Sequence, residues 1–169
     1  MLYVCSLAEA PTHAAQLSVT HMVSMLGDDP FPETPAGVPE RQHLKLNFHD
    51  IPNPEADRIA PATPHIEEFI DFGTAWDRSG PLLIHCYAGI SRSMAAALTL
   101  MCLYNRGREQ EAARLLRAQA PHASPNPRMI AIADFLLACD GRLMDAAADI
   151  GSVPYQGPGG LVQLPIEIT

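Results

Sequence analysis

Apolar positions along this chain alternate between short runs and longer stretches with a helical period. The short runs at residues 2–7, 20–26 and 82–84 predict buried strands, and residues 43–48 alternate as a half-buried strand does. Helical spacing predicts helices over residues 64–76, 94–103, 109–120, 127–139 and 142–149, and residues 11–17 can supply a short additional helix. Strands and helices therefore alternate in the first half of the chain, and helices dominate the second half.

Two proline-rich segments interrupt this pattern, at residues 28–39 and 49–64. Proline is poorly tolerated inside helices and central strands, so we expect both segments to be irregular loops. Residues 151–169 open with Pro and Gly and then alternate at Leu164, Ile166 and Ile168. We expect a single domain over residues 1–150, followed by a C-terminal tail that packs on the domain, adds an edge strand or contacts a partner.

The order of these elements predicts a three-layer α/β fold with a short, mostly parallel central sheet flanked by helices. A chain of 169 residues is long enough to bury one substantial core. Ligands of open α/β sheets bind at the carboxyl ends of the strands. Cys86 stands at that end of the buried strand that begins near residue 82, so the chemistry is expected there.

Charge and cysteine content narrow the function classes. The formal net charge of −8 and the pI near 5.2 disfavour nucleic acid or an anionic membrane as the main partner. The four cysteines show neither a close Cys-x-x-Cys pair nor zinc-type spacing, which indicates reduced thiols, no metal and a cytoplasmic location. Residues 1–26 lack the features of a signal peptide, and no apolar run is long enough to span a bilayer.

The loop after the buried strand carries the strongest chemical signal. Cys86 ends the strand, and Arg92 follows six positions later, where a helix should begin. Backbone N–H groups at such a junction, together with the helix dipole, favour a bound dianion, to which Arg92 can add two parallel charge-assisted bonds. The same positive field favours a thiolate nucleophile. The expected phosphate-binding residues are Tyr87, Ala88, Gly89, Ile90, Ser91 and Arg92.

The stretch His85-Cys86-Tyr-Ala-Gly89-Ile-Ser-Arg92-Ser93 resembles the signature of the cysteine-dependent protein tyrosine phosphatase superfamily. The resemblance implies a protein tyrosine phosphatase-like fold and a metal-independent, cofactor-free reaction through a phosphocysteine at Cys86. It also implies that Ser93 stabilises the leaving thiolate and that His85 orients the loop. The alternatives are an ordinary first-turn serine at Ser93 and a satisfied core histidine at His85.

The resemblance also implies a general acid, an aspartate on a loop that follows an earlier strand. Asp50 matches that position by context, because it follows residues 43–48 directly. Its distance from Cys86 along the chain is longer than the resemblance leads us to expect, so Asp57 in the same proline-rich loop stays open as a rival. Reach to the substrate decides between the two aspartates.

The phosphate-binding loop contains no lysine, which disfavours an inositol-lipid substrate. We therefore expect a compact dual-specificity phosphatase that acts on a phosphorylated protein or a small aryl phosphate. Phosphotyrosine is the expected substrate residue, with phosphoserine and phosphothreonine left open. No tyrosine-bearing segment that would deepen the cleft is evident, so a shallow cleft is expected. The alternatives are a rhodanese-type sulfurtransferase and a non-catalytic module that binds phosphorylated sites.

Overall fold

The computed structural model, which describes residues 1–168, contains one five-stranded sheet with the strand order β3-β2-β4-β1-β5. The strands are β1 (Leu2–Ser6), β2 (His21–Leu26), β3 (His43–Asn47), β4 (Leu82–Cys86) and β5 (Val162–Leu164). Strands β1 to β4 are mutually parallel where they pair, and β5 runs antiparallel to β1. The predicted α/β architecture with a mostly parallel sheet is confirmed.

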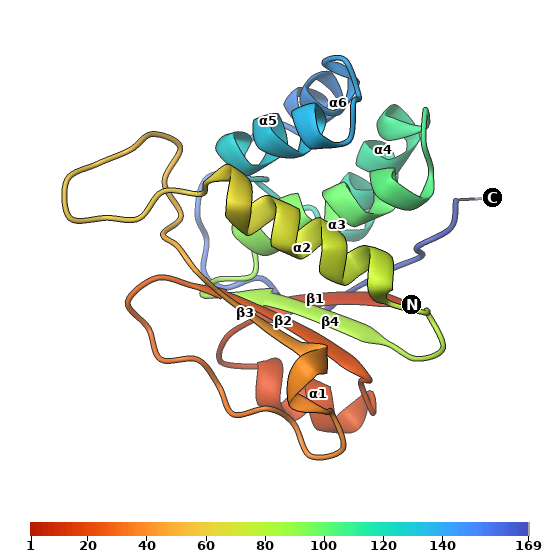
Figure 1. Cartoon of the computed structure of the whole chain (residues 1–169). Coiled ribbons are helices and arrows are strands. Elements are labelled where there is room, and N and C mark those ends of the chain that lie inside the picture. The colour runs from red at the N-terminus through yellow and green to blue at the C-terminus, as the bar shows by residue number, and fades with distance from the viewer. Residues whose placement is uncertain (169) are drawn as a thin grey trace.

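Helices cover both faces of this sheet, which makes three layers (Figure 1). The helices are α1 (Ala10–Gln16), α2 (Thr63–Ala75), α3 (Arg92–Tyr104), α4 (Glu109–Gln119), α5 (Pro127–Leu136) and α6 (Arg142–Ile150), with a 3-10 turn at Glu40–Gln42. Helix α1 lies on one face, and helices α2 to α6 lie on the other (Figure 1). The predicted helices are all present, with boundaries that differ by a few residues.

Strand β4 is central and completely buried, which explains its continuous apolar run. Side chains of a strand alternate between the faces of the sheet. Leu82 and Ile84 accordingly join the large core under α2 to α6, whereas Leu83 joins the smaller core beside α1. Helix α3 follows β4 and is buried from Arg92 to Cys102, so the intervening loop is held between two buried elements.

The C-terminal tail contributes an edge strand to the sheet. Leu164 and Val162 of β5 pair with Leu2 and Val4 of β1. The chain must return from α6 to this edge, so residues 151–161 run past the carboxyl end of the sheet (Figure 1). Of the three alternatives for the tail, the structure has the edge strand.

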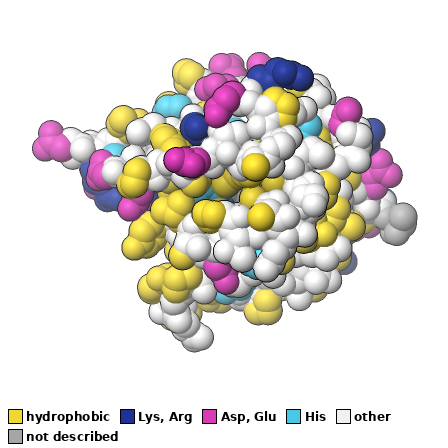
Figure 2. Space-filling view, turned by 90° about the horizontal axis from the view of Figure 1, so that it is seen from below, with side chains coloured by type: hydrophobic (Ala, Val, Ile, Leu, Met, Phe, Trp, Pro, Cys, Tyr) yellow, Lys and Arg dark blue, Asp and Glu magenta, His cyan; other side chains and the backbone are white. Residues whose placement is uncertain are grey.

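The charge distribution on the surface and the length of the helices relate to two expected absences, nucleic acid and membrane as partners. On the face shown in Figure 2, Lys and Arg side chains lie around the edge among Asp and Glu side chains. Such an interspersed distribution differs from the basic stripe that binds nucleic acid. Within residues 1–168, none of the helices has the length and apolarity needed to cross a membrane.

Candidate active site

The loop between β4 and α3 turns its carbonyl groups outward, where neighbouring segments bind them. The four bonds run from Leu7 N to Tyr87 O (3.1 Å), Gly159 N to Ala88 O (2.8 Å), Ser124 N to Ile90 O (3.0 Å) and Asn126 N to Ser91 O (3.4 Å). The C=O and N–H of a trans peptide point in opposite directions. The following amides therefore point to the inside of the loop, where they can converge on an anion.

Gly89 makes this close turn feasible. Its φ is +73°, a conformation that glycine adopts at little cost. A Cβ at this position would lie 2.7 Å from the carbonyl carbon of Cys5 and 2.8 Å from the amide nitrogen of Ser6. The loop thus packs directly on the backbone at the end of β1, which leaves room for glycine alone.

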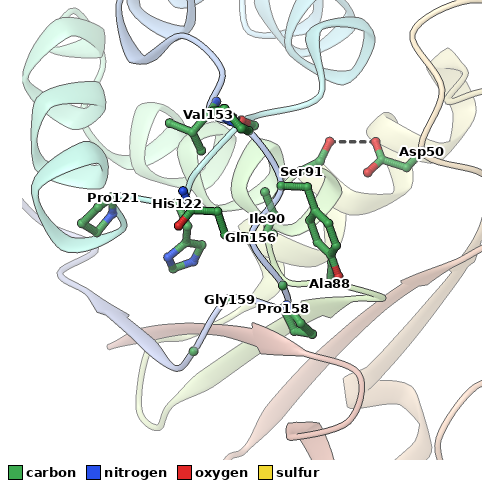
Figure 3. Close-up of a pocket in the computed structure, with 15 residues that line it drawn as sticks. Asp50, Ala88, Ile90, Ser91, Pro121, His122, Val153, Gln156, Pro158 and Gly159 are labelled. Carbon is green, nitrogen blue, oxygen red and sulfur yellow. Dashed lines mark hydrogen bonds between the residues drawn. The ribbon is translucent and has the colours of Figure 1, made fainter.

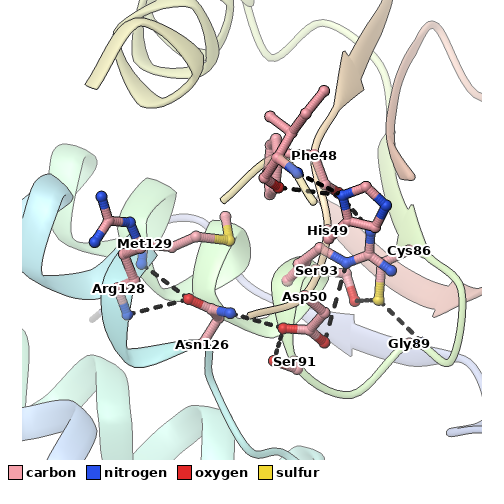
Figure 4. A network of polar contacts seen from close by, with 12 residues as sticks. Phe48, His49, Asp50, Cys86, Gly89, Ser91, Ser93, Asn126, Arg128 and Met129 are labelled. Atoms are coloured by element: carbon pink, nitrogen blue, oxygen red, sulfur yellow. Dashed lines mark hydrogen bonds and ion pairs between the residues drawn. The ribbon is translucent and has the colours of Figure 1, made fainter. Parts of the chain in front are cut away.

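Cys86 lies at the base of the loop and is only 2 % exposed. Its Sγ accepts a hydrogen bond from the Gly89 N–H at 3.2 Å and lies 3.2 Å from the Ser93 hydroxyl (Figure 4). Both groups can donate to a thiolate, and such charge-assisted bonds stabilise the anionic sulfur. The sequence prediction that Ser93 contacts the cysteine sulfur agrees with this geometry.

Arg92 opens α3 and is buried against the strand that precedes Asp50. Its Nη1 donates to the carbonyl oxygen of Phe48 at 2.8 Å, and its Nε lies 4.0 Å from Asp50 Oδ2. Among the described residues, this buried Nε has no hydrogen-bond partner. Buried donors without a partner are costly, and a bound phosphate oxygen would satisfy this one.

Asp50 lies at the rim of the same loop (Figure 4). Its Oδ1 accepts hydrogen bonds from the Ser91 hydroxyl and from Asn126 Nδ2, both at 2.7 Å. Asn126 is itself held as the N-cap of α5, because its Oδ1 accepts the backbone N–H groups of Arg128 and Met129. Asp50 is thus oriented by two side chains, and its Oδ2 is left on the side of Arg92.

The rival Asp57 lies outside this cluster. His49 N donates to Ile59 O at 2.7 Å and Ile59 N donates to His49 Nδ1 at 2.9 Å, which closes residues 50–58 into an excursion of the chain. Asp57 stands in this exposed excursion with a φ of +63°. The additional residues between Asp50 and Cys86 are therefore accommodated in a surface loop.

His85 anchors the start of the loop through a buried polar chain across the sheet. Its Nε2 lies 2.6 Å from the hydroxyl of Ser24, which lies 2.8 Å from His43 Nε2, and His43 Nδ1 lies 2.9 Å from the hydroxyl of Thr34. Burial lowers the pKa of His85 to about 4 and the pKa of His43 to about 4. Both imidazoles are therefore neutral near pH 7, and the chain acts as an uncharged support.

The sequence did not predict the contacts that three parts of the chain make in this site. Asn126 directly precedes the helix predicted over residues 127–139, and it binds Asp50 in addition to capping α5. Ser24 and His43 were seen as strand residues only, and the tail was not connected with the loop, although Gly159 binds Ala88. Ser24 is a polar residue inside β2, a strand whose side chains are buried on both faces, and this was the available signal for a partner of His85.

The other three cysteines are core residues with raised pKa values. Within residues 1–168, no cluster of His, Cys, Asp and Glu has the arrangement of a metal site. Burial raises the pKa of Cys5 to about 12 and that of Cys139 to about 11, and it raises the pKa of Cys102 further still. These three cysteines are therefore protonated, inert core residues at neutral pH.

A scan of family models matches residues 2–133 to the model described as "Dual specificity phosphatase, catalytic domain". The chain belongs to this family. Dual specificity protein phosphatase 15 of Rattus norvegicus is 27% identical over 121 residues, which cover 71% of this chain and 47% of the relative. A MAP kinase phosphatase with leucine-rich repeats of Dictyostelium discoideum is 28% identical over 113 residues, 66% of this chain but 12% of that protein.

The solved structures of dual specificity phosphatases have the same fold. The crystal structure of DUSP15 superposes with a TM-score of 0.63 at 21% identity, covering 88% of this chain and 89% of that one. Human DUSP28 gives a TM-score of 0.62 at 22% identity, covering 82% and 92%. This chain spans about half the length of the rat relative and about an eighth of the Dictyostelium one. Membership of this family does not favour the sulfurtransferase or the non-catalytic alternative.

Proposed function

We propose that this chain is a cysteine-dependent phosphatase that hydrolyses phosphate monoesters of phosphoproteins, without a metal ion. The observation that carries the proposal is the position of the Cys86 sulfur below inward-facing amides, with Arg92 and Asp50 on the rim. This arrangement supplies a nucleophile, donors for the phosphoryl oxygens and an acid in one site. The four unpaired, buried cysteines support a reducing, cytoplasm-like compartment.

In the first step the Cys86 thiolate attacks phosphorus and the P–O bond to the leaving group breaks. The loop amides and Arg92 stabilise the charge on the phosphoryl oxygens. Asp50 gives its proton to the leaving oxygen through Oδ2, because two hydrogen bonds hold Oδ1. The products are an alcohol or phenol and a phosphocysteine.

In the second step a water molecule attacks the phosphocysteine. Asp50, now a carboxylate, takes a proton from this water, and the P–S bond breaks to release inorganic phosphate. The Ser93 hydroxyl, 3.2 Å from Sγ, stabilises the thiolate as it leaves. Asp50 and Cys86 both return to their starting states.

The test is hydrolysis of a small aryl phosphate in the presence of a chelator by wild type, Cys86→Ser, Asp50→Asn and Asp57→Asn. We expect Cys86→Ser to be inactive and Asp50→Asn to lose about 10²-fold in kcat. Asp57→Asn is the matched control from the same loop and should retain full activity. Activity in Cys86→Ser would refute the mechanism, and a loss confined to Asp57→Asn would overturn the acid assignment.

A further inference from the structure

A cavity of about 670 Å³ lies beside the phosphate-binding loop. Four parts of the chain line it: Asp50 on the loop after β3, the phosphate-binding loop, the segment before α5, and the tail (Figure 3). We call the tail residues 153–160 the C-terminal wall. All eight of them line the cavity, together with Ala88, Ile90 and Ser91 of the phosphate-binding loop.

The C-terminal wall is held near both of its ends. Helix α6 precedes it, and β5, paired with β1, follows it. Val153 N donates to the Ser124 hydroxyl at 2.9 Å, and Gly159 N donates to Ala88 O at 2.8 Å. A Cβ on Gly159 would lie 2.4 Å from His122 Nε2, so the wall packs tightly there. This wall is a built part of the cleft.

The lining of the cavity is mainly apolar and carries little charge. Val153, Pro154, Tyr155 and Pro158 form the apolar part of the C-terminal wall. Among residues 1–168, no Lys or Arg lines the cavity, and Asp50 is the one carboxylate that does. A group that enters beside the phosphate is therefore favoured if it is uncharged and presents a flat apolar surface.

We propose that the C-terminal wall binds the aromatic ring of a phosphotyrosine side chain while its phosphate occupies the loop. This inference rests on the proposed phosphatase function and adds the part of the chain that discriminates between its ester substrates. A phosphotyrosine ring is large enough to contact Tyr155 and the apolar wall. A phosphothreonine has only a Cβ and one methyl group beyond the ester oxygen, so it gains nothing from the wall. Binding that favours one ester over the other appears as a difference in kcat/KM.

The test uses two peptides with identical flanking residues, one with phosphotyrosine and one with phosphothreonine. Wild type, Tyr155→Ala, Tyr155→Phe and Phe135→Ala are compared. Phe135 is the matched control, because it is an exposed aromatic residue on α5 that does not line this cavity (77% exposed, against 66% for Tyr155).

We expect wild type to prefer the phosphotyrosine peptide by at least about tenfold in kcat/KM. Tyr155→Ala should lower kcat/KM for that peptide about fivefold and leave the phosphothreonine value unchanged, as expected for one lost aromatic contact. Tyr155→Phe and Phe135→Ala should behave as wild type. An unchanged preference in Tyr155→Ala, or equal losses on both peptides, would overturn the role of the wall alone. Absence of any Cys86-dependent turnover of either peptide would overturn both this inference and the proposed function.

Discussion

Replacement of Gly89 by alanine separates the two reasons for a glycine in the phosphate-binding loop. Gly89 has a φ of +73°, and Gly107, in the turn between α3 and α4, has a φ of +80°. An added Cβ on Gly107 meets nothing within 4 Å, whereas the Cβ on Gly89 meets the backbone of Cys5 at 2.7 Å. Gly107→Ala is therefore the control for left-handed strain without a close contact.

An alanine in the left-handed conformation lowers the unfolding free energy by about 1–2 kcal/mol, and this loss applies to both variants. At Gly89 the loop must additionally move by about 0.7 Å to reach an ordinary contact with β1, because a strand backbone cannot give way. Overpacking of this kind costs about 1–3 kcal/mol more. The moved amides lie directly above Cys86, and a misplacement approaching 1 Å can lower catalysis about 10²-fold.

The assays are urea unfolding and hydrolysis of a small aryl phosphate by both variants. We expect Gly89→Ala to lose about 3 kcal/mol of unfolding free energy and about 10²-fold in kcat/KM. We expect Gly107→Ala to lose about 1 kcal/mol and to keep its activity within about twofold. If Gly89→Ala is no less stable and no less active than Gly107→Ala, the close approach of the loop to β1 contributes neither to stability nor to catalysis, and this prediction is wrong.

Two further predictions concern the residues that support the site. Asn126→Ala should lower the unfolding free energy by about 1 kcal/mol, because α5 loses its cap, whereas Asn126→Asp keeps a capping oxygen. Both variants should lower kcat, because Asp50 loses the Nδ2 donor, and full activity in Asn126→Asp would contradict this. Burial keeps the pKa of His85 at about 4, below its ordinary 6.5, so the unfolded chain binds the proton first as the pH falls. His85 should therefore contribute about 3 kcal/mol to the decrease in unfolding free energy from pH 7 to pH 4, in addition to the contribution of His43, whose pKa is also about 4. Urea unfolding at the two pH values should show a decrease smaller by about that amount in His85→Asn than in wild type.

The strands, the helices and the phosphate-binding loop could be predicted because their causes are local. Buried strands and helices differ in the period of their apolar residues, and this period is visible within ten residues. The loop signal is local for the same reason, since Cys86, Gly89 and Arg92 lie within one strand-to-helix junction. The sequence by itself thus determined the fold class and the chemical nature of the nucleophile and the anion cradle.

Only the tertiary structure decided which distant residues complete the site. Asp50 and Asn126 are far apart in sequence, yet the fold brings their side chains within 2.7 Å of each other. The strand order puts β1 and β2 beside β4, which lets Ser24 support His85. Pairing of β5 with β1 draws the C-terminal wall across the loop, where Gly159 binds Ala88. These contacts join residues that are far apart in the sequence. They produce no periodic pattern of apolar residues, so the local sequence could not predict them.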